Sequence, residues 1–147
     1  MTIVVGSDHA GFEHKEALKA MLVDEGYTVV DVGTHSTDRV DYPDFGVDAA
    51  RLVANGSADY GVLVCGSGIG ISIAANKVKG IRAANVTSVE MARLARQHNN
   101  ANMVAVGERL TPLDEAKEIV NAFLTTDFEG GRHTGRVAKL DALGGDE

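Results

Sequence analysis

The sequence predicts a single three-layer α/β domain, built on an open, five-stranded parallel sheet and ending in a helical tail. Five short runs rich in β-branched residues alternate with longer amphipathic stretches, as strands alternate with crossover helices in a parallel sheet. Most of these runs are continuously apolar, which is typical of strands that helices cover on both faces. A length of 147 residues suits one domain (1–147), and with only 5% aromatic residues its core must consist of Val, Ile, Leu and Ala.

The apolar runs give the positions of the strands. We expect these strands at Thr2–Val5, Thr28–Val32, Tyr60–Cys65, Ile81–Asn85 and Asn102–Val106. Between the strands, apolar residues recur at helical spacing and place one hydrophobic stripe on each helix. The first stripe consists of Ala17, Leu18, Met21 and Leu22, and the second of Phe45, Ala49, Leu52 and Val53.

Prolines and capping-box spacings indicate where helices begin. Pro43 and Pro112 are the only prolines, and each stands where a helix is expected to start, a position that tolerates a missing N–H. Two segments that begin at Thr87 and Thr111 have an acidic residue three positions later, which is the spacing of a capping box. We therefore expect these two threonines to cap the helices that follow them.

Residues 125–147 form a more polar tail. Gly130-Gly131 interrupts it, and Val137, Leu140 and Leu143 then predict a short terminal helix. We expect this helix to pack at the interface of a dimer.

The composition excludes several classes of function. Fourteen Lys and Arg against 21 Asp and Glu give a net charge of -7, which argues against nucleic acid or an anionic membrane as a partner. The single cysteine excludes an internal disulfide and a cysteine-based zinc cluster. The first residues lack the pattern of a signal peptide, and no apolar run approaches the roughly 20 residues that a membrane helix needs. We therefore expect a cytoplasmic protein.

Polar, glycine-rich segments follow three of the predicted strands. They are Gly6–Gly11, Gly66–Gly70, which comes directly after Cys65, and Gly107–Arg109. The carboxyl ends of parallel strands meet at one edge of the sheet, and such sheets bind ligands there. We therefore expect these segments to form one site.

His98 and Asn99 have a different place in the predicted fold. They end the helix before the fifth strand, at the amino end of that strand, so they must reach the site from another direction, such as across a dimer interface. Each candidate feature also has a purely structural interpretation. The glycine-rich segments can be tight turns, Cys65 an inert buried thiol, and His98 and Asn99 a favourable helix C-terminus. Other histidines and arginines are expected at the surface, namely His14, His35, Arg82, Arg93 and Arg96.

Several known loop motifs do not fit these segments. Gly6–Gly11 has the spacing of a P-loop, but Phe12 and Glu13 stand where Lys and Ser/Thr are required. In the loop after the third strand, a dinucleotide fingerprint would need its third glycine at the position of Ile71. A cysteine phosphatase would need an arginine at the same position. A response-regulator receiver domain would need an aspartate where Cys65 stands.

The loop after Cys65 predicts a proton-transferring or nucleophilic thiol. A helix that begins near Ser67–Gly70 directs free N–H groups and partial positive charge at the site, which favours the thiolate. A thiolate beside such donors suits abstraction of a proton α to a carbonyl, because the donors stabilise the enediolate oxygen. A phosphate-like substrate group is indicated by a set of cationic residues, Arg109, Arg132, His133 and Arg136.

Five segments closely resemble the ribose-5-phosphate isomerase B family, which includes the allose- and galactose-6-phosphate isomerases. The resemblance runs nearly end to end and is most specific in the long segment after the third strand. The segments are GSDHAGFEHK (Gly6–Lys15), DYPDF (Asp41–Phe45), CGSGIGISIAANKVKGIRAA (Cys65–Ala84), RQHNNANMVAVGER (Arg96–Arg109) and EGGRHTGRV (Glu129–Val137).

The resemblance implies a Rossmann-like fold and an aldose–ketose isomerase without cofactor or metal. The implied reaction interconverts D-ribose 5-phosphate and D-ribulose 5-phosphate through a cis-enediol(ate), in the non-oxidative pentose phosphate pathway. Homodimers with shared active sites are implied as well, and the sequence leaves open whether two dimers pair as a tetramer. The alternatives are an isomerase of allose 6-phosphate or galactose 6-phosphate, and a non-catalytic sugar-phosphate-binding protein.

Carried over by position, the resemblance assigns three catalytic residues. Cys65 is the base that moves a proton between C1 and C2, Ser67 helps to shuttle protons between the substrate oxygens, and His98 opens the furanose ring. One branch of the family lacks the cysteine and uses a glutamate at the position of Ile71. Cys65 together with Ile71 therefore implies the cysteine branch.

The resemblance also assigns the residues that bind substrate. Asp8 and Asn99 hold sugar hydroxyls, and Tyr42 lines the pocket. The enediolate is held by backbone N–H groups of Gly66, Ser67, Gly68, Ile69 and Gly70. The phosphate is held by residues of which some come from the partner subunit: His9, Arg109, Arg132 and Arg136.

Overall fold

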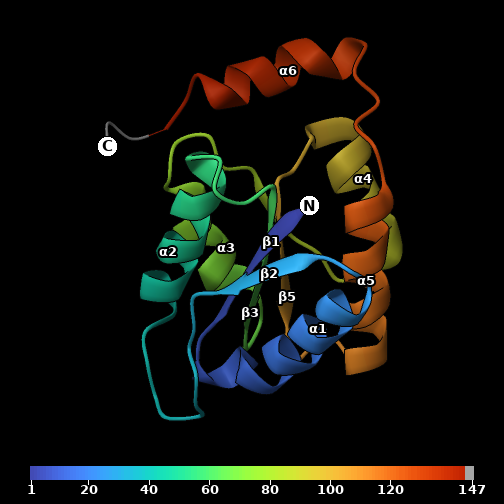
Figure 1. Ribbon diagram of the computed structural model, residues 1–147. Coiled ribbons are helices and arrows are strands. Elements are labelled where there is room, and N and C mark those ends of the chain that lie inside the picture. Colours follow the sequence, from blue (N-terminus) through green and yellow to red (C-terminus); the bar gives the residue numbers. More distant parts are fainter. Residues whose placement is uncertain (145–147) are drawn as a thin grey trace.

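In the computed structural model, which describes residues 1–144, the apolar runs form one five-stranded parallel sheet (Figure 1). The strands lie in the order β2-β1-β3-β5-β4. The chain moves outward from β1 to β2 and then crosses back to β3, so the direction of winding reverses between β1 and β3. Such a reversal opens a crevice at the carboxyl ends of the two strands. The strands are β1 (Thr2–Ser7), β2 (Thr28–Asp31), β3 (Tyr60–Cys65), β4 (Ala83–Asn85) and β5 (Met103–Gly107).

Helices cover both faces of this sheet, because successive strand residues point to opposite faces. Ile3 and Val5 pack in a core with α1, α4 and α5, whereas Val4 and Leu63 pack in a second core with α2 and α3. Figure 1 shows the resulting three layers, which confirm the predicted fold class. The helices are η1 (His9–Gly11), α1 (Phe12–Asp24), α2 (Tyr42–Ala54), α3 (Ile69–Asn76), α4 (Val89–Asn99), α5 (Leu113–Thr125) and α6 (Arg132–Asp141).

The predicted strands are all present, but two predicted helix caps were wrong. Ser88, not Thr87, caps α4, and its hydroxyl accepts the N–H of Met91 at 3.1 Å. The residue before α5 is Pro112, so Thr111 stands one position too early to cap this helix and Pro112 has no side-chain acceptor. Pro43 does lie in the first turn of α2.

Arg96 is buried, which corrects its predicted place at the surface. Its guanidinium donates to the carbonyls of Thr126 at 3.1 Å and Ala101 at 2.8 Å, and to Asn100 Oδ1 at 2.7 Å. It also lies 5.0 Å from the centre of the Tyr60 ring. Burial lowers the pKa of Arg96, but these partners compensate the desolvation of its charge.

Arg82 and His14 are also largely buried, contrary to prediction. Arg82 donates to Asp141 Oδ1 at 2.6 Å and thereby ties α6 to the start of β4. The ring of His14 is bonded through Nε2 to the carbonyl of Thr111 at 2.9 Å. Both side chains sit where backbone carbonyls or carboxylates are available, which a local sequence pattern does not reveal. His35 and Arg93 are exposed, as predicted.

The predicted terminal helix is present as α6, which packs against α4 across the edge of the sheet opposite η1 (Figure 1). Val137 of this helix is buried, whereas Leu140 and Leu143 are exposed in the single chain. Residues 145–147 of the predicted tail lie outside the described residues. Within residues 1–144, no helix is long and apolar enough to span a bilayer.

A buried ion pair connects α1 to the loop that follows β2. The side chain of Lys15 is only 1% exposed, and its Nζ lies 2.7 Å from Asp31 Oδ2 and 2.7 Å from the carbonyl oxygen of Thr34. Burial raises the pKa of the Asp31 carboxyl, but hydrogen bonds from Lys15, the Gly33 N–H and Lys19 outweigh it, so the net pKa lies below its ordinary value. The pair anchors the start of the long connection to α2.

We expect Asp31→Ala to lower the free energy of unfolding at neutral pH by up to about 3–5 kcal/mol, because it removes the buried carboxylate partner of the Lys15 ammonium and leaves the partly exposed Glu16 carboxylate at 3.0 Å. Since the folded pKa of Asp31 lies below its ordinary 3.8, this stabilisation is complete above that pH and is lost as the pH falls through the folded value. Urea unfolding at neutral pH and at about pH 3 measures both effects.

Lys19→Ala serves as the control, because the partly exposed Lys19 contacts the same carboxylate at 3.1 Å and should contribute at most about 1 kcal/mol. An Asp31→Ala penalty as small as that of Lys19→Ala would contradict a dominant role for the buried pair.

Candidate active site

A cavity of about 330 Å³ opens at the carboxyl edge of the sheet, at the reversal point between β1 and β3. The turns after β1, β3 and β5 and the start of α2 form its walls. A cavity of about 430 Å³ lies at the opposite edge, beside the starts of β4 and β5, and includes Arg82, Asn99 and Leu140. The smaller cavity holds the predicted nucleophile, and its lining is Asp8, His9, Ala10, Tyr42, Cys65, Gly66, Ser67, Gly70, Arg109 and Leu110.

The thiol of Cys65 is buried at the end of β3 and points to the start of α3. The N–H of Gly68 donates to Cys65 Sγ at 3.1 Å. Gly68 has a positive φ of 81°, which lets the chain turn sharply from the strand into α3 and aims this N–H back at the sulfur. A donor and the positive end of a helix both stabilise negative charge on sulfur, so this geometry suits a thiol that acts as a base or nucleophile.

Close packing between two turns fixes the position of Ser67. A Cβ atom at Gly107 would lie 2.5 Å from the carbonyl carbon of Ser67, so only glycine fits there. The N–H of Arg109 donates to the carbonyl of Gly66 at 3.0 Å, which joins the turn after β5 to the turn after β3. The hydroxyl of Ser67 accepts the N–H of Ile69 at 3.2 Å and stays within the cavity wall.

Asp8 and His9 form the opposite wall, each held by a backbone N–H. Asp8 Oδ1 accepts the N–H of Gly11 at 3.0 Å, which leaves Oδ2 for a substrate hydroxyl. His9 Nδ1 accepts the N–H of Val40 at 3.1 Å, so the proton of a neutral imidazole lies on Nε2. His9 therefore offers a hydrogen-bond donor.

Tyr42 and Arg109 line the rest of the cavity. The ring of Tyr42 packs so closely on Gly70 that a Cβ there would lie 2.6 Å from Tyr42 Cζ. The guanidinium of Arg109 lies over Gly66, and a Cβ added at Gly66 would lie 3.2 Å from Arg109 Nη1. The site thus combines a thiol, a hydroxyl, a carboxylate and a cationic group within one small volume.

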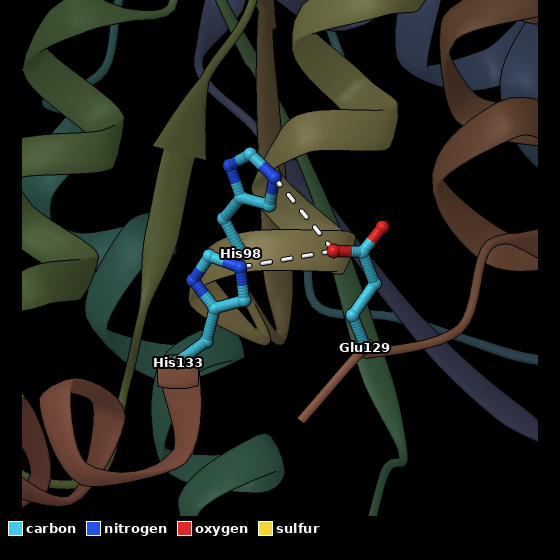
Figure 2. A group of neighbouring side chains, drawn as sticks. All are labelled: His98, Glu129 and His133. Carbon is cyan, nitrogen blue, oxygen red and sulfur yellow. Dashed lines mark ion pairs between the residues drawn. The ribbon is translucent and has the colours of Figure 1, made fainter. Parts of the chain in front are cut away.

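The single chain does not bring the other predicted residues into this cavity. His98 and Asn99 end α4, and Arg132 and Arg136 lie on α6, at the far edge of the sheet. There the ring of His98 stacks on that of His133, with ring centres 4.4 Å apart (Figure 2). The sequence predicted one cationic set of Arg109 with Arg132, His133 and Arg136. In one chain the sheet separates Arg109 from the other three, which lie on α6.

Glu129 is a functional candidate that the sequence reasoning missed. Its carboxylate lies beside the two stacked rings, 3.9 Å from His98 Nε2 and 3.7 Å from His133 Nε2 (Figure 2). Its spacing of four residues from His133 was the available signal. Burial lowers the pKa of His133, and Arg132 and His98 lower it further, while Glu129 opposes them.

Comparison with known proteins supports one family. The family model described as Ribose/Galactose Isomerase matches residues 3–140. This chain belongs to that family. It is 48% identical to ribose-5-phosphate isomerase B of Escherichia coli strain K12, over 96% of this chain and 95% of that protein.

Solved structures of the Ribose/Galactose Isomerase family have the same fold. Ribose-5-phosphate isomerase B of Clostridium thermocellum superimposes with a TM-score of 0.95 at 51% identity, covering 97% of this chain and 96% of that chain. The Mycoplasma genitalium enzyme with bound ribulose-5-phosphate gives a TM-score of 0.92 at 42% identity, covering 96% and 94%. This agreement confirms the resemblance seen in the sequence and the Rossmann-like sheet.

We expect Gly68→Ala to lower isomerase kcat by about 100-fold, because its new Cβ would displace the loop that holds Cys65 and Ser67. That Cβ would clash with Asn85 Oδ1 and would lie 2.9 Å from the carbonyl carbon of Val106. Steady-state kinetics of the purified variant measure the effect.

Gly26→Ala is the matched control. Gly26 has a positive φ of 92°, but a Cβ there would meet nothing within 4 Å. It should therefore lose about 1 kcal/mol of stability and keep its activity. Equal activity in both variants would show that the turn does not need glycine at residue 68.

Proposed function

We propose that this chain interconverts D-ribose 5-phosphate and D-ribulose 5-phosphate through a cis-enediolate. The observation that carries the proposal is the Gly68 N–H on Cys65 Sγ, at the start of a helix and inside a cavity that also holds Arg109. Both the family and the bound ribulose-5-phosphate of the Mycoplasma genitalium relative support this substrate class.

The proposed reaction is a proton transfer in which the substrate is neither oxidised nor reduced overall. The Cys65 thiolate removes the C2 proton of the open-chain aldose, and the C2–H electrons form the C1–C2 double bond as the carbonyl oxygen becomes negative. That oxygen is stabilised by backbone N–H groups of the Gly66–Gly70 turn other than those of Gly68 and Ile69, which already donate to Cys65 Sγ and Ser67 Oγ. Ser67 helps to move a proton from O2 to O1, and the Cys65 thiol returns its proton to C1, so no redox cofactor is required.

The charge and donors of the cavity suit a phosphorylated sugar. Arg109 supplies a planar guanidinium, and His9 supplies an Nε2–H donor. Asp8 Oδ2 suits a sugar hydroxyl, and the ring of Tyr42 suits an apolar face of the chain. We propose that the protein acts in the cytoplasm, where a free thiol stays reduced.

Cys65→Ala should lower kcat by about 100- to 10,000-fold, the usual contribution of a general base, while D-ribulose 5-phosphate still binds. Calorimetric titration measures binding, and exchange of the substrate C2 proton with solvent measures the proton transfer. Full activity in this variant would remove Cys65 from the mechanism, and loss of binding alone would make the thiol a structural group.

We further propose that the functional site is shared between two copies of the chain. His98, Asn99, Arg132 and Arg136 would reach the partner's Cys65 cavity, where they would open the ring and hold the phosphate. Several apolar side chains that are exposed in one chain support such an interface, namely Ile69, Ile73, Leu140 and Leu143. Two such dimers could pair as a tetramer.

Mixing Cys65→Ala with His98→Asn should restore activity to about one quarter of wild type. Half of randomly reassorted dimers are mixed, and each mixed dimer has one site with both defects and one site with neither. Activity is measured after the two inactive variants are unfolded and refolded together.

Cys65→Ala mixed with Ser67→Ala is the matched control, because both changes lie in the cavity of a single chain and every mixed site keeps one defect. No rescue in the first mixture would contradict a shared site. Rescue in both mixtures would show that the assay does not report reassortment.

A six-carbon sugar phosphate is the second candidate substrate, because the matching family covers galactose as well as ribose isomerases. The ratios of kcat/KM for D-ribose 5-phosphate, allose 6-phosphate and galactose 6-phosphate decide between the substrates. A ratio in favour of either hexose phosphate would overturn the five-carbon assignment and leave the isomerase chemistry unchanged.

A further inference from the structure

Three potential metal ligands converge at the far edge of the sheet. They are His98 Nε2 at the end of α4, Glu129 Oε1 in the connection to α6, and His133 Nε2 in the first turn of α6 (Figure 2). All three atoms lie within 4.8 Å of one another. Within one chain, this cluster contributes no group to the cavity that contains Cys65.

His133 Nε2 indicates that the cluster is incomplete. The side chain is only 7% exposed, and Nε2 is buried without a hydrogen-bond partner among the described residues. An unpaired buried nitrogen is energetically costly, so such atoms usually have a partner. The neighbouring Glu129 Oε1, at 3.7 Å, is too far away to be that partner.

A simple ion pair does not explain this arrangement. A protonated imidazole would draw the carboxylate to about 2.7–2.9 Å, but the two distances to Glu129 are 3.7 and 3.9 Å. Protonating both stacked rings would place two positive charges at the 4.4 Å ring separation. Two imidazole nitrogens and a carboxylate oxygen gathered this closely instead match the ligand preference of a divalent cation.

The backbone around the cluster is held independently of the three side chains. The N–H of Glu129 donates to the carbonyl of Gln97 at 3.1 Å, which fixes the connection against α4 beside His98. The N–H of His133 donates to the carbonyl of Gly130 at 3.0 Å. Arg96 adds its bond to the carbonyl of Thr126, so the ligands project from an organised backbone.

We propose that His98, Glu129 and His133 form a binding site for a zinc-class divalent transition-metal ion. Two imidazoles and one carboxylate are a common three-residue set for Zn²⁺, and they leave a fourth position for water or another oxygen ligand. The set is too rich in nitrogen to suit Mg²⁺ or Ca²⁺, which prefer oxygen ligands.

To bind one ion the two imidazoles must turn, because they stack nearly parallel, at 15° and with ring centres 4.4 Å apart. Zn–N and Zn–O bonds of about 2.0–2.2 Å place tetrahedral ligand atoms about 3.4 Å apart, against 3.7 and 3.9 Å for the two pairs with Glu129. His98 and Glu129 are 38% and 50% exposed at the side chain, so both can rotate toward the buried His133. Arg132 and Arg136 lie near enough to influence His133 and reduce the affinity for a cation, while Glu129 offsets them.

Occupancy of this site would inhibit the isomerase, and this part of the inference rests on the proposed function. A metal ion on His98 Nε2 takes the lone pair that ring opening requires, and it fixes the imidazole away from the partner's cavity. The metal is therefore an inhibitor, and a chelator should restore activity to a zinc-treated enzyme.

Direct titration of the metal-stripped protein with Zn²⁺, in competition with a chromophoric chelator, tests the site without substrate. We expect Glu129→Gln and His133→Asn each to weaken Zn²⁺ binding by at least about tenfold. The matched controls are Glu118→Gln and His35→Asn, an exposed carboxylate and an exposed imidazole elsewhere, which should bind as wild type does. Wild-type binding by Glu129→Gln and His133→Asn would overturn the proposal.

Co²⁺ as a spectroscopic substitute identifies the ligands. A site of nitrogen and oxygen ligands gives d–d bands without the intense thiolate-to-cobalt charge-transfer absorption in the near ultraviolet. That absorption, together with loss of binding in Cys65→Ser, would place the metal at the thiol and overturn the assignment.

Activity of the metal-stripped enzyme separates the two proposals. If it converts D-ribose 5-phosphate, the proposed function stands, and the Zn²⁺ concentration for half inhibition should rise in Glu129→Gln by the same factor as the Kd. If it is inactive while Zn²⁺ binds as expected, the function fails and the site stands. If Zn²⁺ binds at the cluster without inhibiting an active enzyme, the inhibitory role is overturned.

Discussion

The close packing of the turn after β3 on the turn after β5 is the constraint on which the candidate site depends. The N–H groups of Glu108 and Arg109 donate to the carbonyls of Cys65 and Gly66 at 2.9 and 3.0 Å, and Gly107 allows the backbones to meet. Main-chain contacts thus orient the thiol and the guanidinium relative to each other. The side chains remain available for substrate, because they are not needed to hold the turns together.

Regular patterns in the sequence were sufficient for the sheet and for the cavity at its carboxyl edge. Apolar runs predicted every strand, and the rule that parallel strands end together predicted the meeting of Asp8, Cys65 and Arg109. Arg96 was mispredicted because its burial depends on the carbonyl of Thr126, which is distant in sequence. Helix starts were mispredicted by one residue, since Thr87 and Ser88 are both acceptable caps and the loop geometry selects between them.

The sheet also separates the polar residues into two groups. Net charge, at -7, gives no sign that cationic side chains gather at both edges, with Arg109 at one and Arg132 and Arg136 at the other. Residue type alone led to one cationic set, because no strand follows α6 in the described chain and strand–helix alternation therefore does not fix the edge at which this helix lies. The fold explains the separation, and two copies of the chain offer a way to reunite the groups.

The contacts of Arg96 make the end of α4 locally more stable than the last turns of α6, although both lie at the far edge of the sheet. One guanidinium bonds to the end of α4 and to the residue after α5, and it lies over rings from β3 and α5, so residues near His98 can open only when much of the domain opens. The last turns of α6 expose Leu140 and Leu143, and their tie to β4 runs through the partly exposed carboxylate of Asp141 on Arg82. Amide exchange should therefore be slow at the end of α4 and faster in those turns, so that the backbone that carries His98 is rigid beside a helix whose far end opens more readily.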